Sequence, residues 1–175
     1  ITSRNELSLA EMKNILEAEK KYIHKPTFKY SLTFFYSIHK DMFQYVWEWA
    51  GKKRVVNVNI GVDAAQIDIE LKKLIDDLNF WEANNANLVE IVSYLHHRLV
   101  KIHPFLNGNG RWARFVTKLY ARSIHDTTIQ WPEAEYTRTS NFRSQYISAL
   151  SKADKLDYTD LIAIQKKCIL TNKNV

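Results

Sequence analysis

His103-Pro-Phe-Leu-Asn-Gly-Asn-Gly-Arg-Trp-Ala-Arg114 is the stretch around which this chain is organised. Two of the four glycines of the chain, Gly108 and Gly110, lie within it. Glycine allows positive φ and lets a ligand approach the backbone closely, so a chain with few glycines has few other places for either. The spacing of apolar residues predicts a helix from 88 to 103, and a second helix from 111 to 123.

This stretch is therefore a loop at the N-terminus of a helix, where unpaired N–H groups and the helix dipole favour an anion. Arg111 and Arg114 fall on one face of the first turns of that helix. Cations at this end oppose the dipole, and a bound polyphosphate would explain their presence. His103 would then be a base beside a phosphate site. A simple helix-to-helix connector is the alternative, since Asn and Gly are common turn residues.

The whole stretch resembles the Fic family motif His-Pro-Phe-x-(Asp/Glu)-Gly-Asn-Gly-Arg-x-x-Arg, and Asn107 is its one departure. Within the family it looks closest to a subgroup carried on bacterial mobile elements, called mobile mystery protein B. The resemblance implies an all-α, Fic-type helical bundle with one small β-hairpin, the flap. It also implies a single Fic domain over 1–175, with the active loop at 103–114 and the flap at about 54–67.

Fic enzymes transfer AMP from ATP to a Ser, Thr or Tyr hydroxyl of a target protein and release pyrophosphate, with Mg²⁺ bridging two phosphates. The resemblance makes His103 the general base, a task that neutral imidazole suits. It makes Phe105 the anchor of the loop. It assigns phosphate binding to five residues: Gly108, Asn109, Gly110, Arg111 and Arg114.

Asn107 stands where the family has an acidic Mg²⁺ ligand. An amide oxygen can coordinate Mg²⁺, and the phosphates of the substrate supply many of the ligands, but the amide brings no negative charge. The interpretations that remain open are a slower AMP transferase, a transferase with another phosphate-containing donor, and a non-catalytic module that binds nucleotide or protein. We favour the transferase, acting as a bacterial toxin or a regulator.

Arg54 to Ile60 alternates β-branched and polar residues and predicts a strand, the only convincing one in the chain. In Fic proteins this place holds the flap, which pairs with the backbone of the target by strand addition. The resemblance therefore predicts these target-docking residues: Asn59, Ile60, Gly61, Val62, Ala64, Ala65 and Gln66.

Further helices are predicted at 8–22, 31–49, 68–83, 141–153 and 161–170. Ser8 and Glu11 would form a capping box at the start of the first. His39, in the aromatic-rich second helix, has no evident partner and is interpreted as structural or surface. His96 and His97 do not have the spacing of a helical metal site, so we expect one to be packed and one exposed.

The net charge of +6 and pI near 9.3 permit an anionic partner, but no nucleic-acid-binding motif is visible and direct nucleic-acid binding is not expected. The single cysteine, Cys168, excludes an internal disulfide. No apolar run reaches the ~20 residues of a membrane span, so we expect a cytoplasmic protein without membrane contact.

Many Fic enzymes are inhibited by a helix with the pattern Ser/Thr-x-x-x-Glu-Gly/Asn. Thr2-Ser3-Arg4-Asn5-Glu6-Leu7 matches it in part, because Leu7 replaces the Gly or Asn. Glu6 would then pair with Arg114, although a solvated acid is the simpler interpretation. An inhibitory, antitoxin-like partner protein is the alternative form of control.

Overall fold

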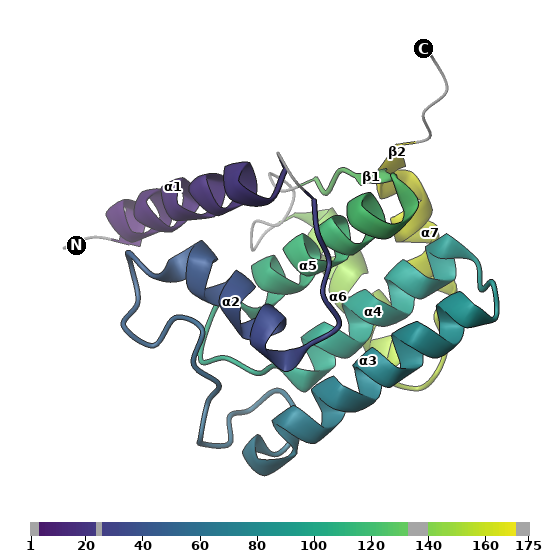
Figure 1. The fold of residues 1–175 in the computed structure, drawn as a ribbon, viewed down its shortest axis with the longest axis horizontal. Coiled ribbons are helices and arrows are strands. Elements are labelled where there is room, and N and C mark those ends of the chain that lie inside the picture. The colour runs from purple at the N-terminus through teal and green to yellow at the C-terminus, as the bar shows by residue number, and fades with distance from the viewer. Residues whose placement is uncertain (1–3, 24–25, 133–139, 171–175) are drawn as a thin grey trace.

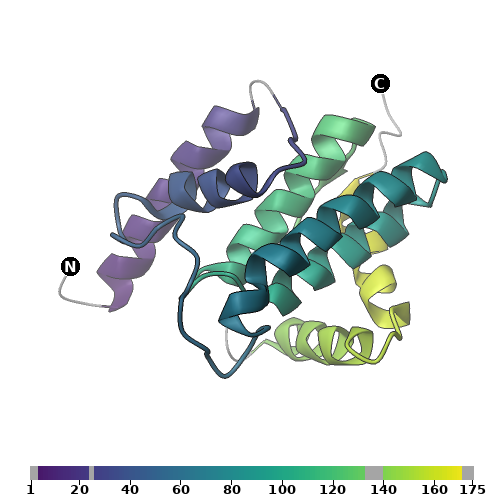
Figure 2. The same ribbon diagram turned by 60° about the horizontal axis from the view of Figure 1, so that its bottom comes forward.

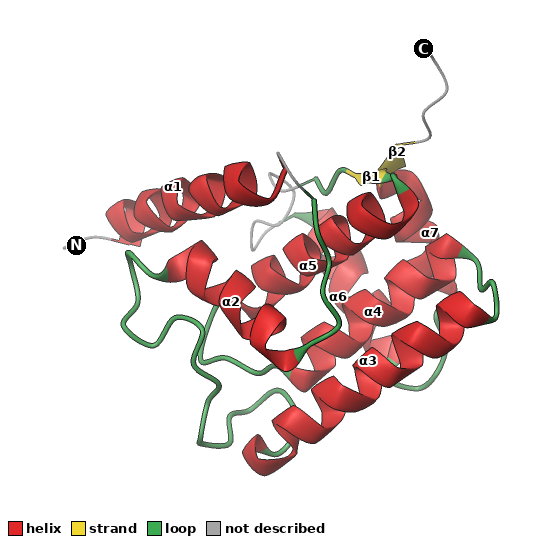
Figure 3. Ribbon diagram, viewed as in Figure 1, coloured by secondary structure: helices red, strands yellow, loops and turns green. Residues whose placement is uncertain are grey.

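The computed structural model describes residues 4–23, 26–132 and 140–170 of the chain. Within these ranges helices dominate, and the strands are short (Figures 1 and 3). The elements in chain order are α1 (Arg4–Ile23), α2 (Leu32–Phe43), η1 (Ala64–Gln66), α3 (Ile67–Ala83), α4 (Leu88–Ile102), α5 (Asn109–His125), β1 (Thr128–Ile129), α6 (Asn141–Ala153), α7 (Thr159–Cys168) and β2 (Ile169–Leu170).

The α4–α5 pair is the centre of the bundle. α3 and α7 pack against α4, α2 packs against α5, α1 covers α2, and α6 packs against α7. Figure 2 shows α1 and α2 at one side of this central pair and α6 at the other. The interior between the helices is filled by large side chains with almost no solvent exposure, among them Phe35, Phe105, Trp112 and Tyr120. The predicted all-α bundle is confirmed.

The ends of several helices follow from their capping residues. The side chains of Ser31, Asn87 and Ser140 each accept a hydrogen bond from the first turn of α2, α4 and α6, respectively. Three predicted boundaries are wrong. The last helix, α7, ends at Cys168 rather than at residue 170, because Ile169 and Leu170 pair as the strand β2. α1 begins at Arg4, so Ser8 and Glu11 lie inside the helix and form no capping box. α2 ends at Phe43 rather than at residue 49, and a series of turns follows it.

The strand predicted from Arg54 to Ile60 is wrong, because these residues form an irregular loop. A strand requires a partner strand, and here the guanidinium of Arg54 takes carbonyl oxygens of the loop instead. The apolar side chains of the segment, including Val55 and Ile60, point to solvent. In the described part of the chain, strand pairing joins β1 to β2, antiparallel, with Thr128 opposite Leu170. We keep the name flap for residues 54–67.

Cys168 is buried at the end of α7, where burial raises the pKa of its thiol to about 11. None of the helices described has the length and apolar character that crossing a membrane demands.

Candidate active site

The active loop joins two helix ends by means of two residues with left-handed backbone conformations. His103 has φ +52° and ends α4, and Gly108 has φ +79° and precedes α5. A Cβ atom on Gly108 would lie 2.8 Å from the ring of Phe43, so only glycine fits there. The loop therefore brings His103 and the N-terminus of α5 to the same cleft.

Asn109 and Phe105 close the loop from within. The backbone N–H of Phe105 donates to Oδ1 of Asn109 over 2.9 Å, and Nδ2 of Asn109 donates to the carbonyl of Phe105 over 2.8 Å. Phe105 is fully buried and meets Trp112 edge-on. The Asn109 side chain, predicted as a phosphate donor, thus also holds the loop, and the second N–H of its amide group is what remains for a ligand.

His103 has a hydrogen-bonding pattern that suits a base. Its Nδ1 lies 3.4 Å from the carbonyl oxygen of Val100, which can only accept, so Nδ1 carries the proton and Nε2 is the basic atom. Burial lowers the pKa of His103, the Val100 carbonyl opposes this shift, and the charge of Arg54 adds to it. The imidazole is therefore neutral near pH 7 and can accept a proton.

Arg54 ties the flap to the active loop, a role that the sequence did not reveal. Its side chain is almost completely buried. Nε donates to the carbonyl of His103 over 2.8 Å, Nη1 donates to the carbonyl of Val56 over 2.9 Å, and Nη2 donates to the carbonyl of Val62. The backbone N–H of Arg54 also donates to the carbonyl of Pro104 over 2.8 Å. In the sequence, Arg54 is one of several basic residues, and nothing there marks it as the residue that holds the flap.

Gly61 brings the flap against His103. It has φ +112°, and a Cβ atom there would lie 2.7 Å from Cβ of His103 and 2.8 Å from Nη2 of Arg54. Of the predicted target-docking residues, five are exposed and two, Val62 and Ala64, are half-buried. Ile60, Gly61 and Val62 line the cleft beside His103.

The two motif arginines lie in different surroundings. Arg111 pairs with Glu11 of α1 through two hydrogen bonds, of 2.7 and 3.1 Å, and stacks over the Phe43 ring. Burial alone would raise the pKa of Glu11, but its hydrogen bonds to Arg111 and Trp47 and the charge of Arg111 hold that pKa below its usual value. Arg114 is buried and faces the cleft.

Glu6 lies exposed in the first turn of α1, and Thr2 and Ser3 lie outside the described residues. The acid of α1 that binds a motif arginine is Glu11, which the sequence had suggested only as part of a cap.

Asn107 is exposed at the edge of the cleft, and its Oδ1 accepts the N–H of Gly108 over 2.7 Å. No cluster of three His, Cys, Asp or Glu side chains suitable for a metal occurs in the described ranges. One neutral amide oxygen fits a Mg²⁺ ion that arrives with phosphates, since such ions take few ligands from the protein.

The cleft has a volume of about 970 Å³. Its walls are the flap, the end of α4, the active loop and one side of α6, and cations from three of these elements line it: Lys101, Arg111, Arg114 and Arg143. A cleft of this size, with backbone amides and arginines at one end and a basic imidazole beside them, can hold a nucleoside polyphosphate.

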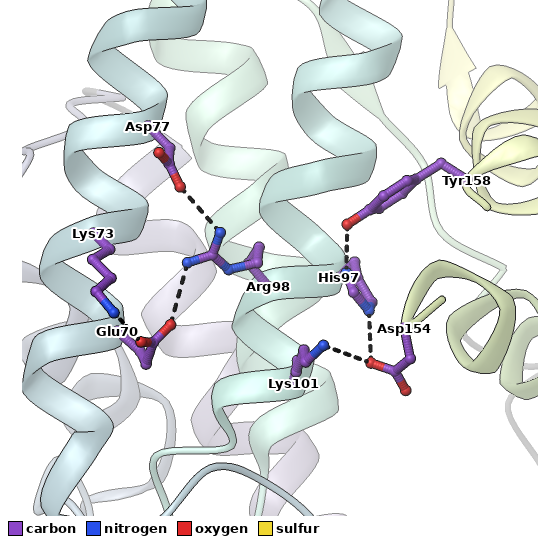
Figure 4. Close-up of polar contacts among 8 residues, drawn as sticks. All are labelled: Glu70, Lys73, Asp77, His97, Arg98, Lys101, Asp154 and Tyr158. Carbon is purple, nitrogen blue, oxygen red and sulfur yellow. Dashed lines mark hydrogen bonds and ion pairs between the residues drawn. The ribbon is translucent and has the colours of Figure 1, made fainter. Parts of the chain in front are cut away.

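His96 and His97 are both buried, so the expectation that one is exposed is wrong. Nε2 of His96 lies 2.7 Å from the hydroxyl of Tyr146. His97 bonds Tyr158 and Asp154 with its two ring nitrogens, and Lys101 also pairs with Asp154 (Figure 4). These contacts tie α4 to α6 and α7 at the side of the cleft.

His39 agrees with the structural one of its two predicted interpretations, and it has partners that the sequence did not show. It is fully buried, stacks on Phe105 with ring centroids 3.6 Å apart, and accepts the N–H of Gly51 at Nδ1. Its Nε2 lies 3.1 Å from the carbonyl oxygen of Asn107 in the active loop. Burial and the charge of Arg111 lower its pKa to about 4, against the smaller effect of the Asn107 carbonyl.

The fold is a helical bundle in which a glycine-containing loop between two central helices places a helix N-terminus, a common anion site in proteins, beside a histidine. The model of the Fic/DOC family matches residues 29–121. The chain belongs to the Fic/DOC family. No comparison distinguishes the subgroup that the sequence suggested.

The relatives include protein adenylyltransferase VbhT of Bartonella schoenbuchensis, which is 30% identical over 75% of this chain and 30% of its own length. Protein adenylyltransferase fic-1 of Caenorhabditis elegans is 34% identical over 40% of this chain and 15% of its own length. The chain thus spans less than a third of either relative. A crystal structure of BepC from Bartonella tribocorum with bound AMPPNP shares the fold, with a TM-score of 0.75, 18% identity, and coverage of 99% of this chain and 90% of that one.

Proposed function

We propose that this chain is a protein adenylyltransferase that transfers AMP from ATP to a Ser, Thr or Tyr hydroxyl of a target protein. The observation that carries the proposal is His103, a neutral imidazole with basic Nε2, at the same cleft as the N-terminus of α5 and two arginines. The adenylyltransferase names of the relatives and the AMPPNP in the BepC structure support the same activity.

In the proposed reaction the hydroxyl oxygen of the target attacks the α-phosphorus of ATP while His103 Nε2 accepts the hydroxyl proton. A P–O bond forms to the target, the bond between the α-phosphorus and its bridging oxygen breaks, and pyrophosphate leaves. The amides of Gly108, Asn109 and Gly110 would bind phosphate oxygens. Arg111 and Arg114 would stabilise the charge on the leaving pyrophosphate.

The target would lie along the flap at residues 59–66, of which Ile60, Gly61 and Val62 line the cleft. Mg²⁺, brought by ATP and contacted by Asn107, would neutralise phosphate charge. A cytoplasmic location, where ATP is available, a role as toxin or regulator, and a single domain over 1–175 belong to the same proposal.

Control of the site is proposed at the α1 side. A phosphate would compete with Glu11 for Arg111, since both bind its guanidinium. Inhibition through Glu6, or by an antitoxin-like partner protein, remains a further proposal. A gain in transfer for Glu6→Gly would support the first.

The experiment is incubation of the chain with a bacterial lysate and ATP labelled at the α- or the γ-phosphate. Protein labelled from α but not from γ is the expected result, and His103→Ala is the control that should label nothing. Label from γ alone would indicate phosphorylation of the target instead of AMP transfer. Nucleotide binding without any label would favour the alternative that Asn107 allows, a non-catalytic binding module.

A further inference from the structure

Both ring nitrogens of His39 are used, and their partners fix its tautomer. The N–H of Gly51 donates to Nδ1 over 3.0 Å, so Nδ1 carries no proton. The carbonyl oxygen of Asn107 lies 3.1 Å from Nε2 and can only accept, so Nε2 carries the proton and donates it. His39 thus joins the turn after α2 to the active loop across the core.

This contact sets the direction of one peptide plane in the loop. In a trans peptide the C=O and the N–H point in opposite directions, and the described chain has no cis bonds. The carbonyl of Asn107 points into the core at His39, so the N–H of Gly108 points away from the core. There it is bonded to Oδ1 of Asn107, at the wall of the cleft.

We propose that His39 is a positioning residue for phosphate binding: by holding the Asn107 carbonyl it directs the Gly108 N–H at a nucleotide phosphate oxygen, which replaces Asn107 Oδ1. This inference rests on the function proposed above and adds to it a residue outside the family motif. Oδ1 of Asn107 is the acceptor that the phosphate oxygen would replace, and the incoming phosphate would release this side chain.

The local geometry explains why this peptide needs such a restraint. Gly108 lacks a Cβ atom and tolerates a wide range of backbone angles, so the plane before it would turn easily. The ring of Phe105 stacks on the face of the His39 ring, and this packing keeps Nε2 oriented toward the loop. A side chain of the same shape without a donor would leave the Asn107 carbonyl without its partner in the core.

Two substitutions separate the hydrogen bond from the packing. His39→Phe keeps an aromatic ring against Phe105 but has neither the donor for Asn107 nor the acceptor for Gly51, whereas His39→Gln loses the ring but keeps an N–H at similar reach together with an acceptor. Phe34→Leu is the control, because Phe34 is a buried aromatic of α2 that packs on Tyr22 and Phe28, away from the loop. The measurement is ADP affinity by titration calorimetry on the full chain.

ADP should bind His39→Phe about tenfold more weakly, the loss expected for one hydrogen bond to a charged group. His39→Gln and Phe34→Leu should stay within about threefold of the wild type. Wild-type affinity in His39→Phe, or an equal loss in His39→Gln, would overturn the proposal.

If His39→Phe does not fold, the wild-type chain still decides the question by NMR. Addition of ADP should shift the Gly108 amide proton and the Asn107 side-chain amide together. ADP binding that leaves the Gly108 amide unchanged would refute the role of His39 and leave the nucleotide function intact. Absence of any ADP binding to the wild type would instead reject both.

Discussion

The active loop and the flap lie against each other, yet they are held in opposite ways. The loop is fixed from inside by Asn109, by the buried ring of Phe105 and by His39. Arg54 holds the flap at Val56 and Val62, and between these points its side chains face solvent, with Ile60 63% exposed. Groups that take part in a reaction need a fixed geometry. A segment proposed to bind a target protein, such as the flap, must instead remain accessible.

His103→Ala tests the fixed side of this comparison and should have the largest effect. Transfer should fall by about 10²–10⁴-fold, the usual contribution of a general base. ADP affinity should stay near that of the wild type, because the imidazole acts on the incoming hydroxyl. Steady-state transfer and a parallel ADP titration measure the two quantities. Substantial residual transfer would remove His103 from the role of base.

Arg54→Met tests whether the two regions depend on one contact. Three carbonyl oxygens would lose a charged donor, so the free energy of unfolding should fall by about 3 kcal/mol. Lys53→Met is the matched control, because Lys53 is an exposed neighbour that pairs only with Asp68 among the described contacts. Denaturant titration compares them. Equal effects of the two substitutions would mean that Arg54 does not hold the flap.

Two glycines of the loop should respond differently to alanine. Gly108→Ala forces a side chain into φ +79° and against Phe43, so it should cost about 2 kcal/mol of stability. Gly110→Ala meets Arg114 at an ordinary 3.6 Å inside a helix and should be neutral or slightly stabilising. Thermal unfolding of both variants gives the answer, and a comparable loss for Gly110→Ala would contradict this geometry.

Acid should weaken the interior that supports the loop. Burial lowers the pKa of His39 to about 4 and of His96 to about 3, from an unfolded value of 6.5. The unfolded state then binds more protons below pH 6.5, so stability is complete above that pH and falls as pH decreases. Each histidine contributes a slope of up to about 1.4 kcal/mol per pH unit. Denaturant unfolding between pH 7 and 5 measures this pH dependence. His39→Phe should lower its slope by the contribution of one bound proton.

Asn107→Asp should have the smallest effect of these substitutions. A carboxylate at the cleft edge adds the negative charge that a neutral amide lacks, so it should bind Mg²⁺ more strongly. Half-maximal transfer should therefore need about 3–10-fold less Mg²⁺. Titration of Mg²⁺ against transfer tests this. An unchanged requirement would mean that position 107 does not face the metal.

The sequence was informative where the determinants are local. Apolar periodicity located α4 and α5, and the loop between them was recognisable because two of the four glycines of the chain lie in it. The flap strand was predicted wrongly because alternation indicates a strand only if a partner strand exists. His39 and Arg54 were missed because their partners lie 68 and 49 residues away in sequence, and no local pattern marks a buried polar residue.

The grip of Arg54 on the flap has an evolutionary consequence. Its side chain bonds carbonyl oxygens, which every amino acid carries, so side chains from Val55 to Ile60 can be replaced without loss of the anchor. Mutation can thus change the exposed surface of the flap while Gly61 and His103 keep their places. If the flap docks the target as proposed, its surface is replaceable independently of the active loop, and libraries randomised at these surface positions would select for transfer to new targets.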